Sequence, residues 1–239
     1  MMVIEAAGYP AMSDYYSEKL SAELLRRCYE IAPPRVKEYL EAEIEFVLER
    51  VAPSFCVLEL GCGYGRVLGR LADKAGTVIG IDTSHASLLM ASEMMRDVPN
   101  CLLAGMDAVR LAFGDALFDL VICIQNGISA FKVDQEKLIR EAVRVTRQGG
   151  RALFSSYAER FWDDRLEWFE IQARHGLIGE IDHDKTGRGI IVGKDGFRAT
   201  TAGPEHFRAL TAIPGITAFI HEVNHSSIFC EITIEQAIR

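Results

Sequence analysis

Three glycines alternate with other residues directly after a short apolar run, in the segment VLELGCGYGR at positions 57–66. Gly61, Gly63 and Gly65 can adopt the positive φ angles of a tight turn, and their lack of side chains lets a ligand approach the backbone closely. The start of a helix after them would add free backbone N–H groups beside that ligand. This arrangement suits an adenosine-containing ligand that lies across the carboxyl ends of parallel strands.

The spacing of the glycines distinguishes two kinds of adenosine-binding loop. A dinucleotide loop reads G-x-G-x-x-G and would need glycine at position 66, where this chain has Arg66. The third glycine instead stands at position 65, and the acidic Glu59 precedes the first glycine by two residues. An NAD-dependent oxidoreductase is an alternative, but it must explain Arg66, and the sequence offers no clear site for hydride transfer.

Acidic residues also follow the next two apolar runs. Asp82 ends the segment IGID at positions 79–82, and its carboxylate can accept two hydrogen bonds from ribose hydroxyls. NAD sites use an acid in the same way, and an Asp here can also cap a helix, so Asp82 alone does not identify the ligand. Asp107 lies in the segment GMDA at 105–108, and a fourth segment, FDLVICIQN, covers 118–126.

In this order the four segments resemble those of the class I S-adenosylmethionine-dependent methyltransferases, over about residues 55–156. The resemblance implies that Asp107 receives the adenine amino group, that Met106 packs on the adenine face, and that the backbone near Ile124 holds the amino-acid end of the cofactor. Residues 125–129 would then face the methyl group. The implied site for S-adenosylmethionine, with S-adenosylhomocysteine as the product, comprises Glu59, Gly61, Cys62, Gly63, Gly65, Asp82, Thr83, Met106, Asp107, Ala108 and Ile124.

Apolar runs alternate with helical patterns through the middle of the chain, which predicts a parallel, doubly wound α/β sheet. The resemblance implies a Rossmann-like sheet of seven strands in the order 3-2-1-4-5-7-6, with the last strand antiparallel; its usual RxLxxGG turn appears at 144–150 with Thr146 and Gln148 as departures. Strands are expected over 55–60, 77–81, 101–104, 119–124, 151–155, 216–223 and 227–234, and helices over 66–75, 85–96 and 134–146, the last closed by Gly149 and Gly150.

Two regions lie outside this cofactor-binding core at 55–156, within a single domain expected over 1–239. Residues 13–50 carry helical patterns, and the resemblance implies that residues 1–52 form a helical lid. After a helix over 161–174, a small β insertion is expected over 177–201, with strands at 177–181, 189–193 and 197–201 and a turn at 194–196. A helix over 204–212 and the closing strand pair complete residues 204–239.

The acceptor side follows from the resemblance to small-molecule methyltransferases, which implies that the lid and the insertion build the acceptor pocket. Aromatic, cationic and amide side chains in or near these segments are candidates to contact the acceptor. These candidate residues are Tyr16, Tyr29, Arg35 and Asn126.

The composition excludes several other classes of protein. The chain has 239 residues, with 26 basic and 34 acidic side chains and a formal net charge of −8. It lacks the basic footprint of a DNA-binding module and the polybasic patch of a peripheral membrane protein, so neither DNA nor a membrane is an expected partner. The six cysteines show no zinc-binding spacing, so no metal is expected. Without a convincing signal peptide or an apolar stretch of roughly 18 residues, a cytoplasmic location is predicted.

The resemblance implies in-line transfer of a methyl group from the cofactor's sulfonium to an acceptor, with a small molecule favoured and a protein or RNA acceptor left open. A general base is needed only if the acceptor must lose a proton. No residue in the sequence can be assigned to that role, so the catalytic residues, the methylated atom and the oligomeric state stay open. A methyltransferase-like protein that binds the nucleoside without turnover is a further alternative.

Overall fold

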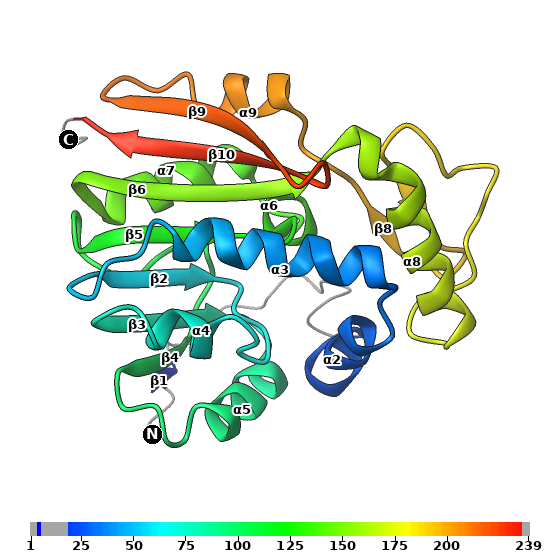
Figure 1. Ribbon diagram of the computed structural model, residues 1–239, viewed down its shortest axis with the longest axis horizontal. Coiled ribbons are helices and arrows are strands. Elements are labelled where there is room, and N and C mark those ends of the chain that lie inside the picture. The colour runs from blue at the N-terminus through cyan, green and yellow to red at the C-terminus, as the bar shows by residue number, and fades with distance from the viewer. Residues whose placement is uncertain (1–3, 6–18, 236–239) are drawn as a thin grey trace.

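A mixed β-sheet of eight strands runs through the part of the chain that the computed structural model describes, residues 4–5 and 19–235 (Figure 1). The strand order is β1-β4-β3-β2-β5-β6-β10-β9, and only the two pairings of β10 are antiparallel among these neighbours. The strands are β1 (Ile4–Glu5), β2 (Cys56–Leu60), β3 (Thr77–Asp82), β4 (Cys101–Gly105), β5 (Phe118–Cys123), β6 (Thr146–Tyr157), β9 (Ile216–Val223) and β10 (Ser227–Ile234).

Seven of these strands confirm the predicted topology. Without β1, the order corresponds to 3-2-1-4-5-7-6, and the last strand is antiparallel to its neighbours as expected. The eighth strand, β1, was not predicted; it pairs in parallel with the edge strand β4 through Ile4 and Glu5. A two-residue strand is too short to show an alternating pattern in the sequence.

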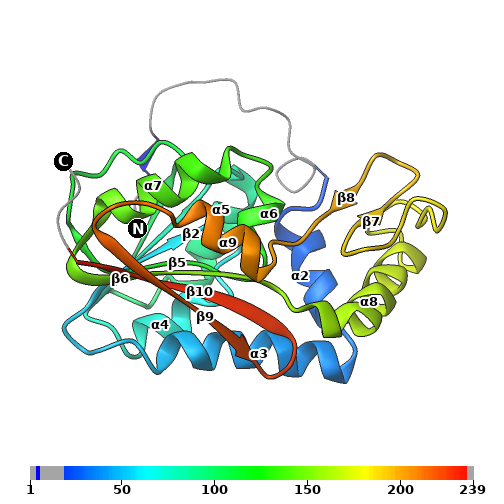
Figure 2. The same ribbon diagram turned by 90° about the horizontal axis from the view of Figure 1, so that it is seen from above.

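Helices cover both faces of the sheet, as a doubly wound fold requires (Figure 2). Alternate residues of each strand point to opposite faces, so Val57 packs with the helices of one face and Leu58 with those of the other. The first face carries α3 (Pro34–Leu48), α4 (Leu68–Ala72) and α5 (His85–Met94). The second face carries α6 (Gly127–Ala130), α7 (Gln135–Val145) and α9 (Pro204–Leu210).

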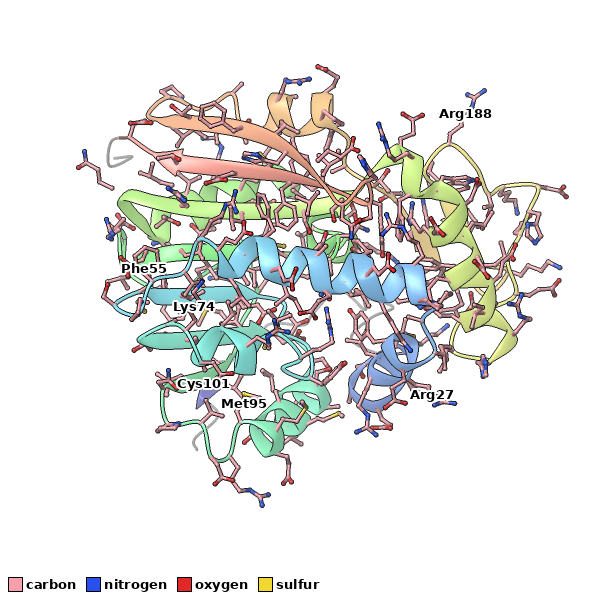
Figure 3. The ribbon with its side chains drawn as sticks, viewed as in Figure 1. Arg27, Phe55, Lys74, Met95, Cys101 and Arg188 are labelled. Atoms are coloured by element: carbon pink, nitrogen blue, oxygen red, sulfur yellow. The ribbon has the colours of Figure 1, made fainter. Side chains whose placement is uncertain are left out.

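A third apolar cluster lies beyond the carboxyl ends of the parallel strands. In Figure 3, Phe55 marks the amino end of β2, and Arg27 marks α2 (Ala22–Glu30) beyond the opposite end. The Trp168 indole N–H donates to the Cys28 carbonyl at 3.0 Å, which fastens α2 to α8. The cluster joins α2, the first half of α3, the 3-10 turn η1 (Glu159–Phe161), α8 (Trp162–Arg174), β7 (Ile191–Val192) and β8 (Arg198–Ala199).

The helix α3 divides between two cores, which the predicted lid over 1–52 did not anticipate. Its first half, with Tyr39 and Leu40, belongs to the third cluster, whereas Ile44 and Val47 pack on the sheet. Of the two described helices before residue 52, α2 alone lies wholly beyond the strand ends (Figure 1). None of the helices in the described residues is long and apolar enough to cross a membrane.

Several predicted boundaries were wrong. The helix expected over 66–75 is only α4, so Arg66 lies in the loop before it. The strand expected over 177–181 does not form; Ile181 makes a single β-bridge with Gly193. The other two insertion strands shorten to β7 and β8, and their turn at 194–196 is observed, with Gly196 at a φ of +94°. The helix before Gly149 already ends at Val145, and β6 begins at the next residue.

Candidate functional site

The three alternating glycines form a tight loop after β2. Gly61, Gly63 and Gly65 have φ angles of +71°, +53° and +90°, which residues with side chains rarely adopt. A Cβ atom at Gly61 would overlap the ring of Phe131, and one at Gly65 would lie 3.2 Å from the Cβ of Ala91. Glycine is therefore needed here both for the backbone conformation and for the space around it.

The carboxylate of Asp82 fixes this loop against the end of β3. Its Oδ2 accepts a hydrogen bond from the Gly63 N–H at 2.8 Å, and its Oδ1 accepts one from the Ser84 N–H at 2.7 Å. Ser84 in turn caps α5 through its side-chain oxygen, which accepts from the Ser87 N–H. Asp82 thus links the glycine loop after β2 to the turn that starts α5.

A small cavity of about 40 Å³ lies between the glycine loop and α2. Leu25 and Tyr29 of α2 form part of its wall, opposite Glu59 at the end of β2 and Arg66 after the loop. Gln125, just after β5, closes another side. Ligand pockets usually measure roughly 300 Å³ or more. The cavity as it stands therefore has room for only part of a cofactor-sized ligand.

Four buried polar atoms of the cavity residues have no hydrogen-bond partner among the described residues: Glu59 Oε2, Arg66 Nε, Arg66 Nη2 and Gln125 Nε2. Burial raises the pKa of Glu59 to about 8, although the nearby Arg66 opposes that shift. An unsatisfied buried polar group costs about 1–3 kcal/mol, so proteins rarely leave several of them together. Their grouping makes this cavity a candidate site for a polar ligand.

Tyr29 covers the cavity from α2 through two contacts. Its hydroxyl donates a hydrogen bond to Gln125 Oε1 at 3.1 Å, and the Arg66 guanidinium lies over its ring, 4.7 Å from the centroid. The rings of Tyr64 and Trp168 also pack near Tyr29, with centroids 6.1 and 6.0 Å from the centroid of the Tyr29 ring. One aromatic side chain thereby connects α2 to both the glycine loop and the end of β5.

The chain after β5 adopts a strained conformation. Gln125 and Asn126 have φ angles of +56° and +63°, which is uncommon for residues other than glycine and is often found at functional sites. The Gln125 N–H is held by two acceptors, Glu43 Oε2 and Ser155 Oγ, each at 2.8 Å. These bonds fix the position from which the Gln125 side chain enters the cavity wall.

Most residues predicted to bind the cofactor lie along one edge of the sheet. Glu59, Asp82 and Ile124 end or follow β2, β3 and β5, and the Met106 N–H donates to the Asp82 carbonyl at 3.1 Å. Asp107 is exposed, and its Oδ1 accepts from the Val109 N–H at 3.0 Å. Because the carboxyl ends of parallel strands meet at the same edge, the order of the motifs was enough to predict this grouping. The remaining members of the predicted site also lie at this edge: Gly61, Cys62, Gly63, Gly65, Thr83 and Ala108.

The four predicted acceptor residues do not gather in one place. Tyr29 lines the cavity, but Arg35 lies at the surface, where it donates to the Asn224 carbonyl at 2.6 Å. Both ends of the Asn126 amide are used within the protein, since Nδ2 donates to the Thr200 carbonyl and Oδ1 accepts from the Ser156 hydroxyl. Tyr16 lies outside the described residues.

The sequence analysis missed several residues of the site, and two of them, Arg66 and Glu43, are charged. The sequence analysis considered Arg66 only because it replaces the third glycine of the dinucleotide pattern. A cation directly after a glycine loop is nevertheless well placed to bind an anion. Glu43 is fully buried in α3. It stands three residues after Leu40 and four before Val47, which places it on the apolar face of the helix. A single carboxylate on an otherwise apolar helix face was the sequence feature that could have identified it as a buried polar residue.

Comparisons with known proteins agree with this fold and this loop. Residues 57–150 match the family described as "Methyltransferase domain". A 2-methyl-6-phytyl-1,4-hydroquinone methyltransferase from Synechocystis is 28% identical over 165 residues, which cover 63% of this chain and 50% of that protein. The chain thus spans half the length of this curated relative.

Two solved structures share the fold. The PH0226 protein from Pyrococcus horikoshii has a TM-score of 0.70 at 21% identity, over 92% of this chain and 98% of that one. The N-methyltransferase NodS from Bradyrhizobium japonicum, solved with S-adenosylhomocysteine, has a TM-score of 0.59 at 15% identity, over 92% of this chain and all of that one (100%). At these identities the likeness concerns the fold alone.

Proposed function

We propose that the chain is a class I S-adenosylmethionine-dependent methyltransferase and that it transfers a methyl group from S-adenosylmethionine to a small molecule. The observation that carries the proposal is the cavity beside the glycine loop, where a carboxyl oxygen of Glu59 and two guanidinium nitrogens of Arg66 have no hydrogen-bond partner among the described residues. The amino-acid end of this cofactor is a zwitterion and can match both groups. The pyrophosphate of NAD is only anionic and would leave Glu59 without a partner.

The cofactor supplies a methyl group that its sulfonium already activates. The protein's task is therefore to align the two reactants and to exclude water, and such positioning can lower a barrier by roughly 7–11 kcal/mol. The glycine loop allows close approach, Asp82 is placed to accept from ribose hydroxyls, and Met106 and Asp107 follow at the adenine side. Tyr29 and Leu25 can shield the reacting end once α2 has adjusted to the larger ligand.

Three features support a small acceptor. The Synechocystis relative acts, by its name, on a small hydroquinone. The third apolar cluster places α2, α8 and the insertion beyond the strand ends, where they limit access to the methyl group. The net charge of −8 disfavours a nucleic-acid acceptor.

Calorimetric titration of the whole chain with S-adenosylhomocysteine and, in parallel, with NAD tests the cofactor assignment. We expect saturable binding of S-adenosylhomocysteine and none of NAD. Binding of NAD alone would contradict the proposal. Binding of S-adenosylhomocysteine without methylation of any compound in a broad acceptor panel would instead favour a protein that binds the nucleoside without turnover.

The substitution Asp82→Ala is expected to weaken S-adenosylhomocysteine binding by about 2 kcal/mol, or roughly 30-fold. The carboxylate both holds the Gly63 N–H and is placed to accept from the ribose, so its loss affects the loop and the ligand together. The same titration measures this loss, and Asp97→Ala, at an exposed position after α5, serves as the control. An unchanged affinity in folded Asp82→Ala protein would remove Asp82 from the site.

A further inference from the structure

The turn after β5 contacts two separate parts of the molecule through two successive residues. Gln125 lines the cavity beside the glycine loop, whereas the amide of Asn126 bonds to the far end of the insertion over 177–201. Both residues have left-handed φ angles. Such strain persists only where the surroundings hold it firmly, so the contacts that fix this turn have to be specific.

The Asn126 side chain does not cap the helix that it precedes. Asn126 is the N-cap residue of α6, where a side-chain oxygen commonly accepts a hydrogen bond from the first turn, but no such bond forms here. Its Nδ2 instead donates to the Thr200 carbonyl at 2.9 Å, and its Oδ1 accepts from the Ser156 hydroxyl at 2.7 Å. The side chain is thus committed to a contact across 74 residues of chain rather than to its own helix.

Ser156 closes this contact into a clamp. Its Oγ also accepts from the Ala202 N–H at 2.9 Å, so the two side chains together hold the backbone at both Thr200 and Ala202. Asn126, Ser156 and Ala202 are buried, and burial strengthens the hydrogen bonds between them. Residues 200–203 lead from β8 to α9, so the clamp fixes the point where the chain leaves the insertion (Figure 2).

The serine before Ser156 holds the other residue of the turn. Ser155 Oγ accepts from the Gln125 N–H at 2.8 Å, and the Gln125 side chain accepts from the Tyr29 hydroxyl at the cavity. Two successive residues of β6 therefore fix two successive residues of the turn. A single peptide unit, between Gln125 and Asn126, separates the side that faces the cavity from the side that faces the insertion.

We propose that Asn126 is a positioning residue that couples occupation of the cavity to the placement of the insertion. A ligand in the cavity packs against Gln125 and limits the conformations of the turn, and Asn126 passes this restriction to Thr200 and, through Ser156, to Ala202. The inference rests on the proposed function and gives it an order of events. The cofactor binds first, and the acceptor then meets an insertion that is held in place.

Hydrogen–deuterium exchange of the whole chain, with and without saturating S-adenosylhomocysteine, tests this coupling at residues 200–203. In wild-type protein we expect the ligand to slow exchange there by about fivefold or more, which is the lower end of ordinary coupling between two sites. In Asn126→Ala this ligand-dependent slowing should disappear. Because coupling is reciprocal, the affinity of this variant for S-adenosylhomocysteine should fall by no more than the same factor. A contact that only supports the fold would instead raise exchange equally with and without the ligand.

Ser156→Ala removes the same clamp without changing the turn, and it decides the question should Asn126→Ala fail to fold. It should also lose the ligand-dependent slowing. The matched control is Asn224→Ala, which makes the same change at a φ of +49° in the exposed turn between β9 and β10. This control should exchange as wild type does over 200–203, both with and without the ligand.

Two outcomes would overturn the coupling and leave the proposed function standing. One is wild-type protein that binds S-adenosylhomocysteine with no change in exchange over 200–203. The other is folded Asn126→Ala protein that keeps the slowing seen in wild type. Wild-type protein that does not bind S-adenosylhomocysteine would overturn the proposed function and this inference together.

Discussion

The substitution Gly63→Val is expected to abolish S-adenosylhomocysteine binding. The affinity should fall by about 100-fold or more, which corresponds to a loss of binding free energy on the order of 3 kcal/mol. Gly63 lines the cavity at a φ of +53°, and a Cβ there would lie 3.2 Å from Leu25 Cδ2. The two further methyl groups of valine would occupy space in a cavity of only about 40 Å³, and the ligand could no longer approach the loop backbone. Calorimetric titration measures the loss.

A matched control separates this effect from backbone strain. Gly196 has a φ of +94° in the turn between β7 and β8, and apart from its chain neighbours no described residue has an atom within 4 Å of the Cβ it would carry. Gly196→Val therefore brings a similar conformational penalty at a place away from the cavity, and it should bind S-adenosylhomocysteine normally. If Gly63→Val bound the ligand as wild type does, the glycine loop would not be the cofactor site.

Between about pH 5 and pH 8, the free energy of unfolding is expected to fall as the pH rises, and Glu43→Gln should reduce this fall. Burial raises the pKa of Glu43 from 4.5 to about 7, against the opposing hydrogen bonds from Ser155 and the Gln125 N–H. Burial also raises the pKa of Glu59, to about 8. In this range the folded chain keeps protons that the unfolded chain has released, so raising the pH favours unfolding.

Each unit of pKa shift corresponds to about 1.4 kcal/mol of unfolding free energy. The shift of Glu43 should therefore lower the free energy of unfolding by on the order of 3 kcal/mol over this pH range. Urea unfolding at one-unit steps from pH 5 to pH 9 measures it. The control Glu45→Gln lies in the same helix but is exposed, and it should show the pH dependence of wild type. Wild-type stability that rises from pH 5 to pH 8 would contradict the buried, protonated carboxyl groups.

The sheet could be predicted because each of its long strands is marked by local sequence. The closing pair β9 and β10 has the predicted boundaries, and the apolar runs before Gly61, Asp82 and Gln125 became β2, β3 and β5. Motif order then supplied the strand order through the resemblance. The two-residue strand β1 depends on long-range pairing and leaves no local pattern, whereas the strand expected over 177–181 from its local pattern is reduced to a single bridge at Ile181.

The sequence by itself determined the sheet and the row of candidate cofactor-binding positions at its edge, because residues that directly follow parallel strands must lie side by side. Only the tertiary structure decided which side chains complete the cavity. Tyr29 meets Gln125 across 96 residues of chain, and Glu43 meets the Gln125 backbone across 82. Such contacts depend on how α2 and α3 pack over the strand ends, and packing of distant segments is not visible in any local pattern of residues.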